Sequence, residues 1–542
     1  MLIGDIATNN ARRYPNKRAL VDADRMHTWS QVDARARRLA NFMTDRGLNH
    51  GDRVMVIARN CIEWPEISFG LAKAGLVAVP VNIRLAPDEV AHVRDDSGAR
   101  AAIIHADHVV KFVGELADLA VLLGIGTRET IGDNELITDY DTALAHARPS
   151  VPPKCISPDD TAVILYTSGT TGRAKGVMHT HRGLLYQAAD TNLVTEANRS
   201  DVMLATTPFF TAGGMVRTVS WLYLGQTMVI HQRFDPQAVI DEIERSKITF
   251  TTFIPTMLHR TLAILENGPR RDMSSLRRIS YGSAPVPPGL ARKAMDLLGC
   301  DLQQRYGLTE CGGQATILTP QDHRDIVDGK TSIATSCGQE TPMCSIRVIS
   351  TQEGAEGNDT RTGEVGEIVI VSPANAIGYW NRPEQTAETF RPDGLRTGDL
   401  GYLDAENYLH ITGRKTDMII SGGFNVYPAE IERVIAQNVG VDLVAVVGVP
   451  DPEWGETPIA VVIPKPHVTD LGGLTAELTT LCRAELAGYK QPRRFEYRTE
   501  FPLGPAGKIL KREIANQVIQ VVRADEMAGS VPAASGPSRE RP

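Results

Sequence analysis

The sequence predicts an α/β protein with a large N-terminal domain of mixed α/β sheets, a β-rich subdomain and a small α+β C-terminal domain. Strand-like apolar runs alternate with helix-like stretches over the first hundred residues, and the pattern returns near residues 162, 228 and 248. A β-rich stretch follows near residue 364, and the character changes again after Arg414. Strands that alternate with helices favour parallel pairing through crossover helices. A chain of 542 residues also exceeds the usual size of a single hydrophobic core, so we expect two or more domains.

The N-terminal part supplies these alternating elements in order. Residues 28–44 carry apolar side chains at helical spacing and predict an amphipathic helix. Short apolar runs predict buried strands at residues 52–58, 76–81, 162–166, 228–230 and 248–250.

The C-terminal part has a different character. Residues 364–371 end in Gly-Glu-Ile-Val-Ile-Val and predict a strand. A helix at 428–437, a strand at 441–447 and a helix at 474–486 then suggest a compact unit of roughly a hundred residues. We therefore expect an N-terminal domain at 1–414, a C-terminal domain at 415–525 and a disordered tail at 526–542, which is rich in Ser, Pro, Gly, Ala and Arg.

Composition excludes several functional classes. The formal net charge of −8 argues against a nucleic-acid-binding face, and the seven cysteines include no CxxC pair that would suggest a zinc or redox site. The first residues lack a basic segment followed by an apolar one, and no apolar run approaches the ~20 residues that span a bilayer. We therefore expect a cytoplasmic protein with no signal peptide, no nucleic-acid partner and no integral membrane association.

The most informative segment is the loop from Tyr166 to Gly176, Tyr-Thr-Ser-Gly-Thr-Thr-Gly-Arg-Ala-Lys-Gly, which follows a predicted strand. Its glycines let the backbone approach a phosphate, its hydroxyls donate hydrogen bonds, and Lys175 adds a positive charge. It is not the P-loop of nucleotide triphosphatases, because Ala174 and Gly176 stand where that motif needs Gly and Ser or Thr. A flexible surface turn is the alternative interpretation.

Seven further segments follow this loop in order. They are Pro208–Thr211, Tyr281–Pro285, Gln304–Glu310, Arg396–Asp399, Gly413–Asp417, Ser421–Glu430 and Pro505–Ile509. Together with the loop they resemble the motifs of the adenylate-forming superfamily, which includes acyl- and aryl-CoA synthetases, firefly luciferase and peptide-synthetase adenylation domains. The resemblance covers roughly residues 5–515. It implies the adenylate-forming fold with a mobile C-terminal domain, and an ATP-dependent carboxylic acid–CoA ligase that releases AMP and pyrophosphate.

The resemblance also implies which residues bind ATP. Attack of a carboxylate on the α-phosphorus brings two anions together, so the site must neutralise charge and hold the pair in line. Glu310 would bind Mg²⁺, Lys508 would be the catalytic lysine of adenylation, and Thr167 and Lys175 would also be catalytic. The predicted ATP- and AMP-binding set is Thr167, Ser168, Gly169, Thr170, Thr171, Gly172, Lys175, Gly282, Ser283, Ala284, Arg305, Tyr306, Gly307, Thr309, Glu310, Asp399, Arg414 and Lys508.

Within this set, Tyr306 would stack on the adenine ring beside the small residues 282–284. Asp399 and Arg414 would hold the ribose hydroxyls. A surface ion pair is the alternative interpretation for these two residues.

The resemblance also implies an acid pocket and an acceptor site. Thr211 stands where many relatives carry histidine, and the glycines near it suggest a roomy pocket for a bulky apolar acid, whether alicyclic, aryl or medium- to long-chain. The predicted pocket residues are Phe210, Thr211, Gly213, Gly214, Gly312 and Gly313. Coenzyme A would contact Arg233, Gly422 and Gly423, and the hinge would be Thr416, where the family usually has Lys or Asp.

Other functions remain to be weighed. A ligase that loads an acyl-carrier protein is the nearest alternative, because few features of the sequence identify the acceptor site. A peptide-synthetase domain would usually carry Asp near Thr211, and a non-enzymatic binding protein would be expected to have lost Lys175, Glu310 or Lys508. A luciferase-like side activity stays open. The expected partners are a small carboxylic acid, ATP and coenzyme A; the sequence does not identify the acid and leaves a homodimer open.

Overall fold

The structure is a computed structural model that divides the chain into two compact units. The first unit comprises Met1–Thr397 and Tyr402–His410, and the second comprises Gly398–Gly401 and the chain from Ile411 onward. The second unit therefore begins with one short piece, Gly398–Gly401, and continues from Ile411 instead of starting at a single boundary, and the division at residue 415 stays a prediction. The described residues are 1–23, 25–126, 136–150, 155–167, 173–282, 286–352, 354, 356–422, 424–452, 454–503 and 509–527.

An eight-stranded sheet carries the predicted phosphate loop in unit 1. Its central strands are parallel, as the alternation of strands and helices predicts, and β8 and β9 form an antiparallel hairpin. The strand order is β19-β9-β8-β4-β3-β5-β6-β7, with bounds β3 Arg53–Ile57, β4 Val77–Pro80, β5 Ala101–His105, β6 Val121–Ile125, β7 Thr138–Asp139, β8 Thr161–Thr167, β9 Lys175–Thr180 and β19 Gly378–Tyr379.

A nine-stranded sheet forms the rest of the α/β core of unit 1. Its order is β16-β15-β14-β13-β12-β10-β11-β1-β2, with bounds β1 Arg18–Asp22, β2 Arg25–Thr28, β10 Val202–Ala205, β11 Thr227–Ile230, β12 Phe250–Phe253, β13 Arg278–Gly282, β14 Asp301–Tyr306, β15 Thr316–Leu318 and β16 Gln339–Glu340. The predicted strand at 248–250 is displaced, because β12 begins only at Phe250.

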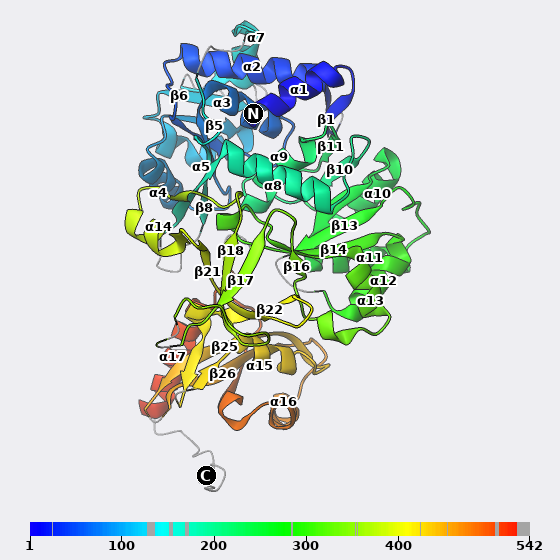
Figure 1. The fold of residues 1–542 in the computed structure, drawn as a ribbon, viewed down its shortest axis with the longest axis vertical. Helices are drawn as coiled ribbons and strands as arrows, with labels where there is room; N and C mark the ends of the chain where they lie inside the picture. Colours follow the sequence, from blue (N-terminus) through cyan, green and yellow to red (C-terminus); the bar gives the residue numbers. More distant parts are fainter. Residues whose placement is uncertain are drawn as a thin grey trace. The chain divides into compact units, whose positions relative to one another are not determined.

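Helices cover both sheets. The predicted amphipathic helix is α2, which begins after Thr28 because that side chain accepts a hydrogen bond from the backbone N–H of Gln31. Figure 1 shows α10 to α13 side by side along the nine-stranded sheet. The unit 1 helices are α1 Asp5–Arg13, α2 Trp29–Asp45, α3 Glu63–Ala74, α4 Pro87–Ser97, α5 Ala106–Leu116, α7 Tyr140–His146, α8 His181–Val194, α9 Ala212–Leu222, α10 Pro236–Ser246, α11 Pro255–Asn267, α12 Pro288–Leu298, α13 Pro320–Val327 and α14 Pro383–Thr389, with short 3₁₀ turns η1 Thr309–Cys311 and η2 Thr331–Ile333.

The β-rich part predicted near residue 364 is a five-stranded sheet. Its strands are β17 Ser345–Ile349, β18 Gly366–Val371, β20 Phe390–Arg391, β21 Gly394–Leu403 and β22 Leu409–Arg414. The chain passes between the two units on β21 and β22. No helix within the described ranges is long and apolar enough to cross a membrane.

The second unit is a small α+β body, as predicted. Its core packs β25, β26, α15 and α16 together through side chains such as Ile431, Val446, Val462 and Leu478. The elements are β23 Ile419–Ser421, β24 Phe424–Val426, β25 Val441–Asp451, β26 Gly455–Pro464, β27 Arg494–Tyr497, α15 Pro428–Ile435, α16 Leu471–Glu485, α17 Lys511–Met527, and the 3₁₀ turns η3 Lys415–Asp417 and η4 Gly488–Lys490.

Candidate active site

The hairpin of β8 and β9 holds the two ends of the predicted phosphate loop together. Thr167 is the last residue of β8, Lys175 is the first of β9, and the two are paired across the ladder. A glycine-rich loop between two paired strands is well suited to present backbone N–H groups to an anion. Residues 168–172 lie outside the described residues, so the roles predicted for Ser168, Gly169, Thr170, Thr171 and Gly172 stay predictions.

Lys175, Tyr379 and Glu310 form one cluster in unit 1. The Nζ of Lys175 lies 3.6 Å from the centre of the Tyr379 ring, and the Tyr379 hydroxyl donates to Oε1 of Glu310 at 2.9 Å. Tyr379 reaches this position because β19 pairs with β9, which places Tyr379 opposite Val177. Glu310 lies on the short turn η1. The backbone N–H of Ala376, three residues before Tyr379, donates a hydrogen bond to the Glu310 carbonyl and so joins η1 to the segment that carries Tyr379.

Burial shapes the charges of this cluster. It lowers the pKa of Lys175, while the Glu310 carboxylate acts in the opposite direction. Burial also raises the pKa of the Tyr379 hydroxyl, and the adjacent Glu310 adds to that shift. A half-buried ammonium over the Tyr379 ring and a carboxylate at its hydroxyl suit a phosphate and its counter-ion, because Mg²⁺ usually binds through one or two carboxylates together with substrate phosphates. Glu310 therefore fits the predicted metal position.

The strand end that carries Tyr306 is closely packed. A side chain on Gly282 would meet the carbonyl oxygen of Arg305 at 2.9 Å, and one on Gly307 would meet the backbone of Gln314 at 2.6 Å. Glycine is therefore required at both positions, because neighbouring backbone lies too close for a side chain. Thr309 begins the turn that carries Glu310. Ser283 and Ala284 lie outside the described residues.

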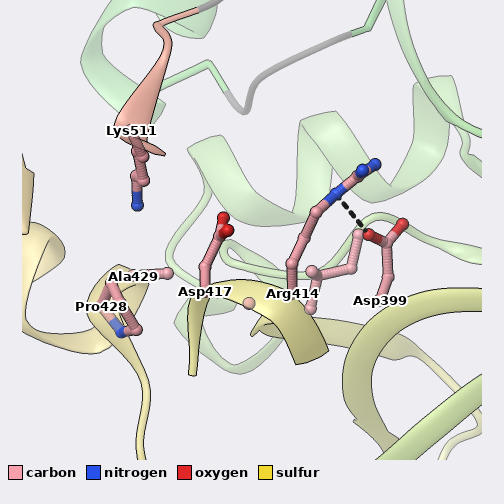
Figure 2. A pocket seen from close by; sticks show the side chains of 8 residues that line it. Asp399, Arg414, Asp417, Pro428, Ala429 and Lys511 are labelled. Carbon is pink, nitrogen blue, oxygen red and sulfur yellow. Dashed lines mark ion pairs between the residues drawn. The ribbon is translucent and has the colours of Figure 1, made fainter. Parts of the chain in front are cut away.

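The predicted ribose pair comes together in unit 2. Nε of Arg414 lies 2.9 Å from Oδ1 of Asp399, which is 5% exposed, whereas the arginine side chain is half exposed. Figure 2 shows this pair beside Asp417, with Lys511 across from them in the same shallow pocket. Nζ of Lys511 also pairs with Glu432 at 2.6 Å. An exposed guanidinium next to a buried carboxylate offers donors and acceptors to a sugar diol.

Several of the predicted acid-pocket residues have a local structural role. Thr211 caps α9: its hydroxyl accepts from the N–H of Gly214 and donates to the carbonyl of Pro208. A side chain on Gly214 would come within 2.0 Å of that carbonyl, so any larger residue there would disrupt the turn. Phe210 belongs to the buried core, and Gly312 and Gly313 have φ of +76° and +89°, which favour glycine.

The remaining predicted residues are those of the hinge and the coenzyme A site, together with Lys508. Thr416 is exposed on η3, and its hydroxyl donates to Asp417 at 3.3 Å. Gly422 has φ of +58° and lies against the Trp454 ring, which is a packing reason for glycine. Arg233 is exposed after β11. Gly423 and Lys508 lie outside the described residues, and their predicted roles stay predictions.

Two residues, Tyr379 and Arg217, were not predicted from the sequence to belong to the site. Tyr379 was missed because no motif covers it, although Gly-Tyr-Trp at 378–380 after a β-rich stretch is an aromatic signal worth testing. Arg217 was missed because it is a lone cation in the apolar sequence of α9. Its guanidinium lies 3.4 Å from where a side chain on Gly213 would begin. A single arginine inside an apolar helix was the available signal.

Comparison with known proteins shows which family the chain belongs to. A family model described as AMP-binding enzyme matches residues 7–380, and one described as AMP-binding enzyme C-terminal domain matches residues 430–508. A feruloyl-CoA synthase from Amycolatopsis sp is 34% identical over 94% of this chain and 98% of its own length. A fatty acid–[acyl-carrier-protein] ligase, ScoC, from Streptomyces coeruleorubidus is 33% identical over 94% and 95%, respectively.

A solved structure shares the fold. The anthranilate CoA ligase AuaEII, in complex with anthranoyl-AMP, superposes with a TM-score of 0.83 at 26% identity and covers 97% of this chain and 98% of its own. The resemblance and the fold class predicted from the motifs are thereby confirmed. The chain belongs to the AMP-binding enzyme family, and it is an AMP-forming acid–thiol ligase.

Proposed function

We propose that this enzyme joins a bulky apolar carboxylic acid to coenzyme A through an acyl-adenylate, with release of AMP and pyrophosphate. The observation that carries the proposal is the Lys175–Tyr379–Glu310 cluster beside the phosphate-loop hairpin, because it brings a cation and a metal-binding carboxylate together. The feruloyl-CoA and anthranilate relatives support a ring-bearing acid and coenzyme A as acceptor. The carrier-protein ligase among the relatives keeps an acyl-carrier protein as the alternative acceptor.

The residues take the following proposed roles. Lys175 and the loop after Thr167 bind the phosphates, and Glu310 holds Mg²⁺, which screens their charge. Tyr306 lies along the adenine, and Asp399 with Arg414 binds the ribose. Lys508 stabilises the charge that builds up as the acid attacks the α-phosphate.

The acid pocket in this proposal involves Gly313 and the start of α9. Gly313 faces open space, because a side chain built there would meet nothing within 4 Å. Thr416 is the proposed hinge of the small unit, Gly422 and Gly423 are the residues beside the pantetheine arm, and Arg233 is the contact to a CoA phosphate. We further propose a cytoplasmic enzyme without integral membrane association, in keeping with these substrates, and a homodimer is open to test.

The test combines acids with acceptors. Pyrophosphate release should be measured with acetate, cyclohexanecarboxylate, cinnamate and decanoate, and thioester formation should be measured with coenzyme A and with a phosphopantetheinylated carrier protein. Burial of ~100 Å² of apolar surface at ~25 cal/mol per Å² is worth ~2.5 kcal/mol, so kcat/KM for the best large acid should exceed that for acetate by about 10²-fold. Coenzyme A should be the better acceptor. Acetate as the best acid would refute the roomy pocket, and exclusive transfer to the carrier protein would refute coenzyme A.

A further inference from the structure

One face of the nine-stranded sheet carries a row of buried polar side chains. Thr252, Ser280 and Gln303 are neighbours in register on β12, β13 and β14, and none is more than 2% exposed. The Oγ1, Oγ and Oε1 atoms of these three residues have no hydrogen-bond partner among the described residues. Because buried polar groups are almost always paired, three neighbouring atoms without a partner point to a ligand that supplies one.

Arg305 lies on the same face of the sheet. It is two residues beyond Gln303 on β14, and side chains two apart on a strand share a face. Gln303 donates to the carbonyl of Val194, at the end of α8, so this face is the one that α8 covers. Arg305 is 8% exposed, and its Nε and Nη2 have no partner among the described residues. Its guanidinium lies 6.0 Å from the centre of the Phe250 ring.

Arg217 reaches this region from α9. The helix α9 packs beside α8, as Figure 1 shows, and its Trp221 stacks edge-on against Phe250 with ring centres 5.7 Å apart. The one hydrogen bond described for the Arg217 side chain is a long one, 3.4 Å from Nη1 to the Thr207 hydroxyl. Within the described part of the chain, no carboxylate forms an ion pair with Arg217. Part of the residue remains accessible, as expected of a group that faces a ligand.

The charges around the two arginines do not balance. Burial lowers the pKa of Arg217 to about 10. Burial and the nearby Arg217 lower the pKa of Arg305 to about 9, and only Asp190 opposes this shift. Arg278 also lowers the pKa of Arg305, but Arg278 forms its own ion pairs with Glu196 and Asp301. Among the residues that the structure describes, two arginines and one aspartate leave one buried positive charge without compensation, which is costly unless an anion joins them.

We propose that Arg217 and Arg305 bind a second anionic group, most simply a carboxylate, on the far end of the acid that this enzyme activates. The inference rests on the proposed function and narrows its substrate to an acid with an apolar body and a distal carboxylate. A guanidinium matches a carboxylate in planar, two-point geometry. The polar row of Thr252 and Ser280 would add hydrogen-bond donors to the same oxygens.

The location favours the acid over the nucleotide as the ligand. Arg217 lies against Gly213, which belongs to the predicted acid pocket. Gly312, another residue of the predicted acid pocket, lies against Gln187 of α8, and Gln187 is three residues before Asp190. The predicted acid-pocket glycines therefore adjoin the same polar region from two directions. The Lys175–Tyr379–Glu310 cluster already supplies charge for the phosphates.

The experiment compares diacids with their own monoesters. Adenylation should be measured as pyrophosphate release with trans-cyclohexane-1,4-dicarboxylate and linear diacids of four to ten carbons, each against its monomethyl ester. In the unaltered enzyme the best diacid should exceed its ester in kcat/KM by about 10-fold or more, on the scale of one charge-assisted interaction. Arg217→Met and Arg305→Met should each abolish this preference. Arg217→Met should leave the KM for ATP unchanged, because Arg217 is not among the predicted ATP-binding residues, and Arg217→Lys should keep part of the preference.

The melting temperature, measured with and without the diacid, distinguishes loss of diacid binding from misfolding of a variant and does not depend on catalytic turnover. Both methionine variants should melt at or above the temperature of the unaltered enzyme without ligand, because each removes an uncompensated buried charge. The best diacid alone should raise the melting temperature of the unaltered enzyme more than that of either variant. The inference is overturned if no diacid is preferred to its ester, if the preference survives both substitutions, or if Arg217→Met raises the KM for ATP with every acid. Absence of adenylation with any acid would instead refute the proposed function, and the ligand-induced melting shift would still report on the arginines.

Discussion

Replacing Lys508 with alanine should reduce acyl-adenylate formation by about 10²-fold or more, since loss of one preorganised charge at a transition state costs about 3 kcal/mol. The variant should still transfer the acyl group from a supplied acyl-adenylate to coenzyme A, because adenylate formation is the step in which charge builds on the α-phosphate. Single-turnover kinetics with ATP and, separately, with synthetic acyl-adenylate would measure the two half-reactions.

Lys511→Ala is the matched control for that prediction. Lys511 lies three residues further along the same unit, and its ammonium pairs with Glu432. Its loss should cost about 1 kcal/mol of stability, as for other partly exposed pairs, and should slow adenylation far less than Lys508→Ala does. Equal losses in both half-reactions for Lys508→Ala would mean that the variant is misfolded or that Lys508 has a different role.

The second large effect should come from Glu310→Gln. Glutamine keeps the shape of the side chain and can still accept the hydrogen bond from Tyr379, but it removes the charge that would hold Mg²⁺. Adenylation should fall by about 10² to 10³-fold, the range for removal of one electrostatic stabiliser. The Mg²⁺ concentration that gives half-maximal rate should rise. Initial rates of pyrophosphate release over a Mg²⁺ titration would measure both quantities.

Tyr379→Phe provides the matched control for Glu310. It removes the hydroxyl that donates to Glu310 and keeps the ring that Lys175 lies over. We expect a loss of less than about 10-fold, the scale of one neutral hydrogen bond, with little change in the Mg²⁺ requirement. If Tyr379→Phe lowers adenylation as much as Glu310→Gln, then Glu310 acts by positioning the tyrosine and does not bind the metal.

Much of the architecture could be predicted from the sequence because local patterns carry it. The parallel central strands of the two large sheets follow from apolar runs between amphipathic stretches, and α2 begins at the Thr28 cap with its Gln31 partner, both of which are visible in the sequence. The small unit was recognisable from the change after Arg414, although β21 and β22 carry short pieces of it earlier in the chain. Local propensity identifies such elements but not where the chain crosses between units.

The details of the site depended on contacts between distant segments. Tyr379 joins Lys175 and Glu310 only because β19 pairs with β9, and no local pattern encodes that pairing. Gly214 was interpreted as a source of pocket volume, whereas its missing side chain is required by the Pro208 carbonyl. The polar row beside Arg305 is likewise invisible in the sequence, because it requires the register of three strands.

The most direct test of the central claim follows an oxygen atom. With the preferred acid labelled with oxygen-18 in its carboxylate, the acyl-adenylate route should place one labelled oxygen in the phosphate of AMP and none in pyrophosphate, because the carboxylate attacks the α-phosphorus and the carbonyl carbon then leaves with the thiol. Mass spectrometry of the nucleotide products reads the result. Labelled phosphate together with ADP, or AMP without the label, would contradict an acyl-adenylate intermediate.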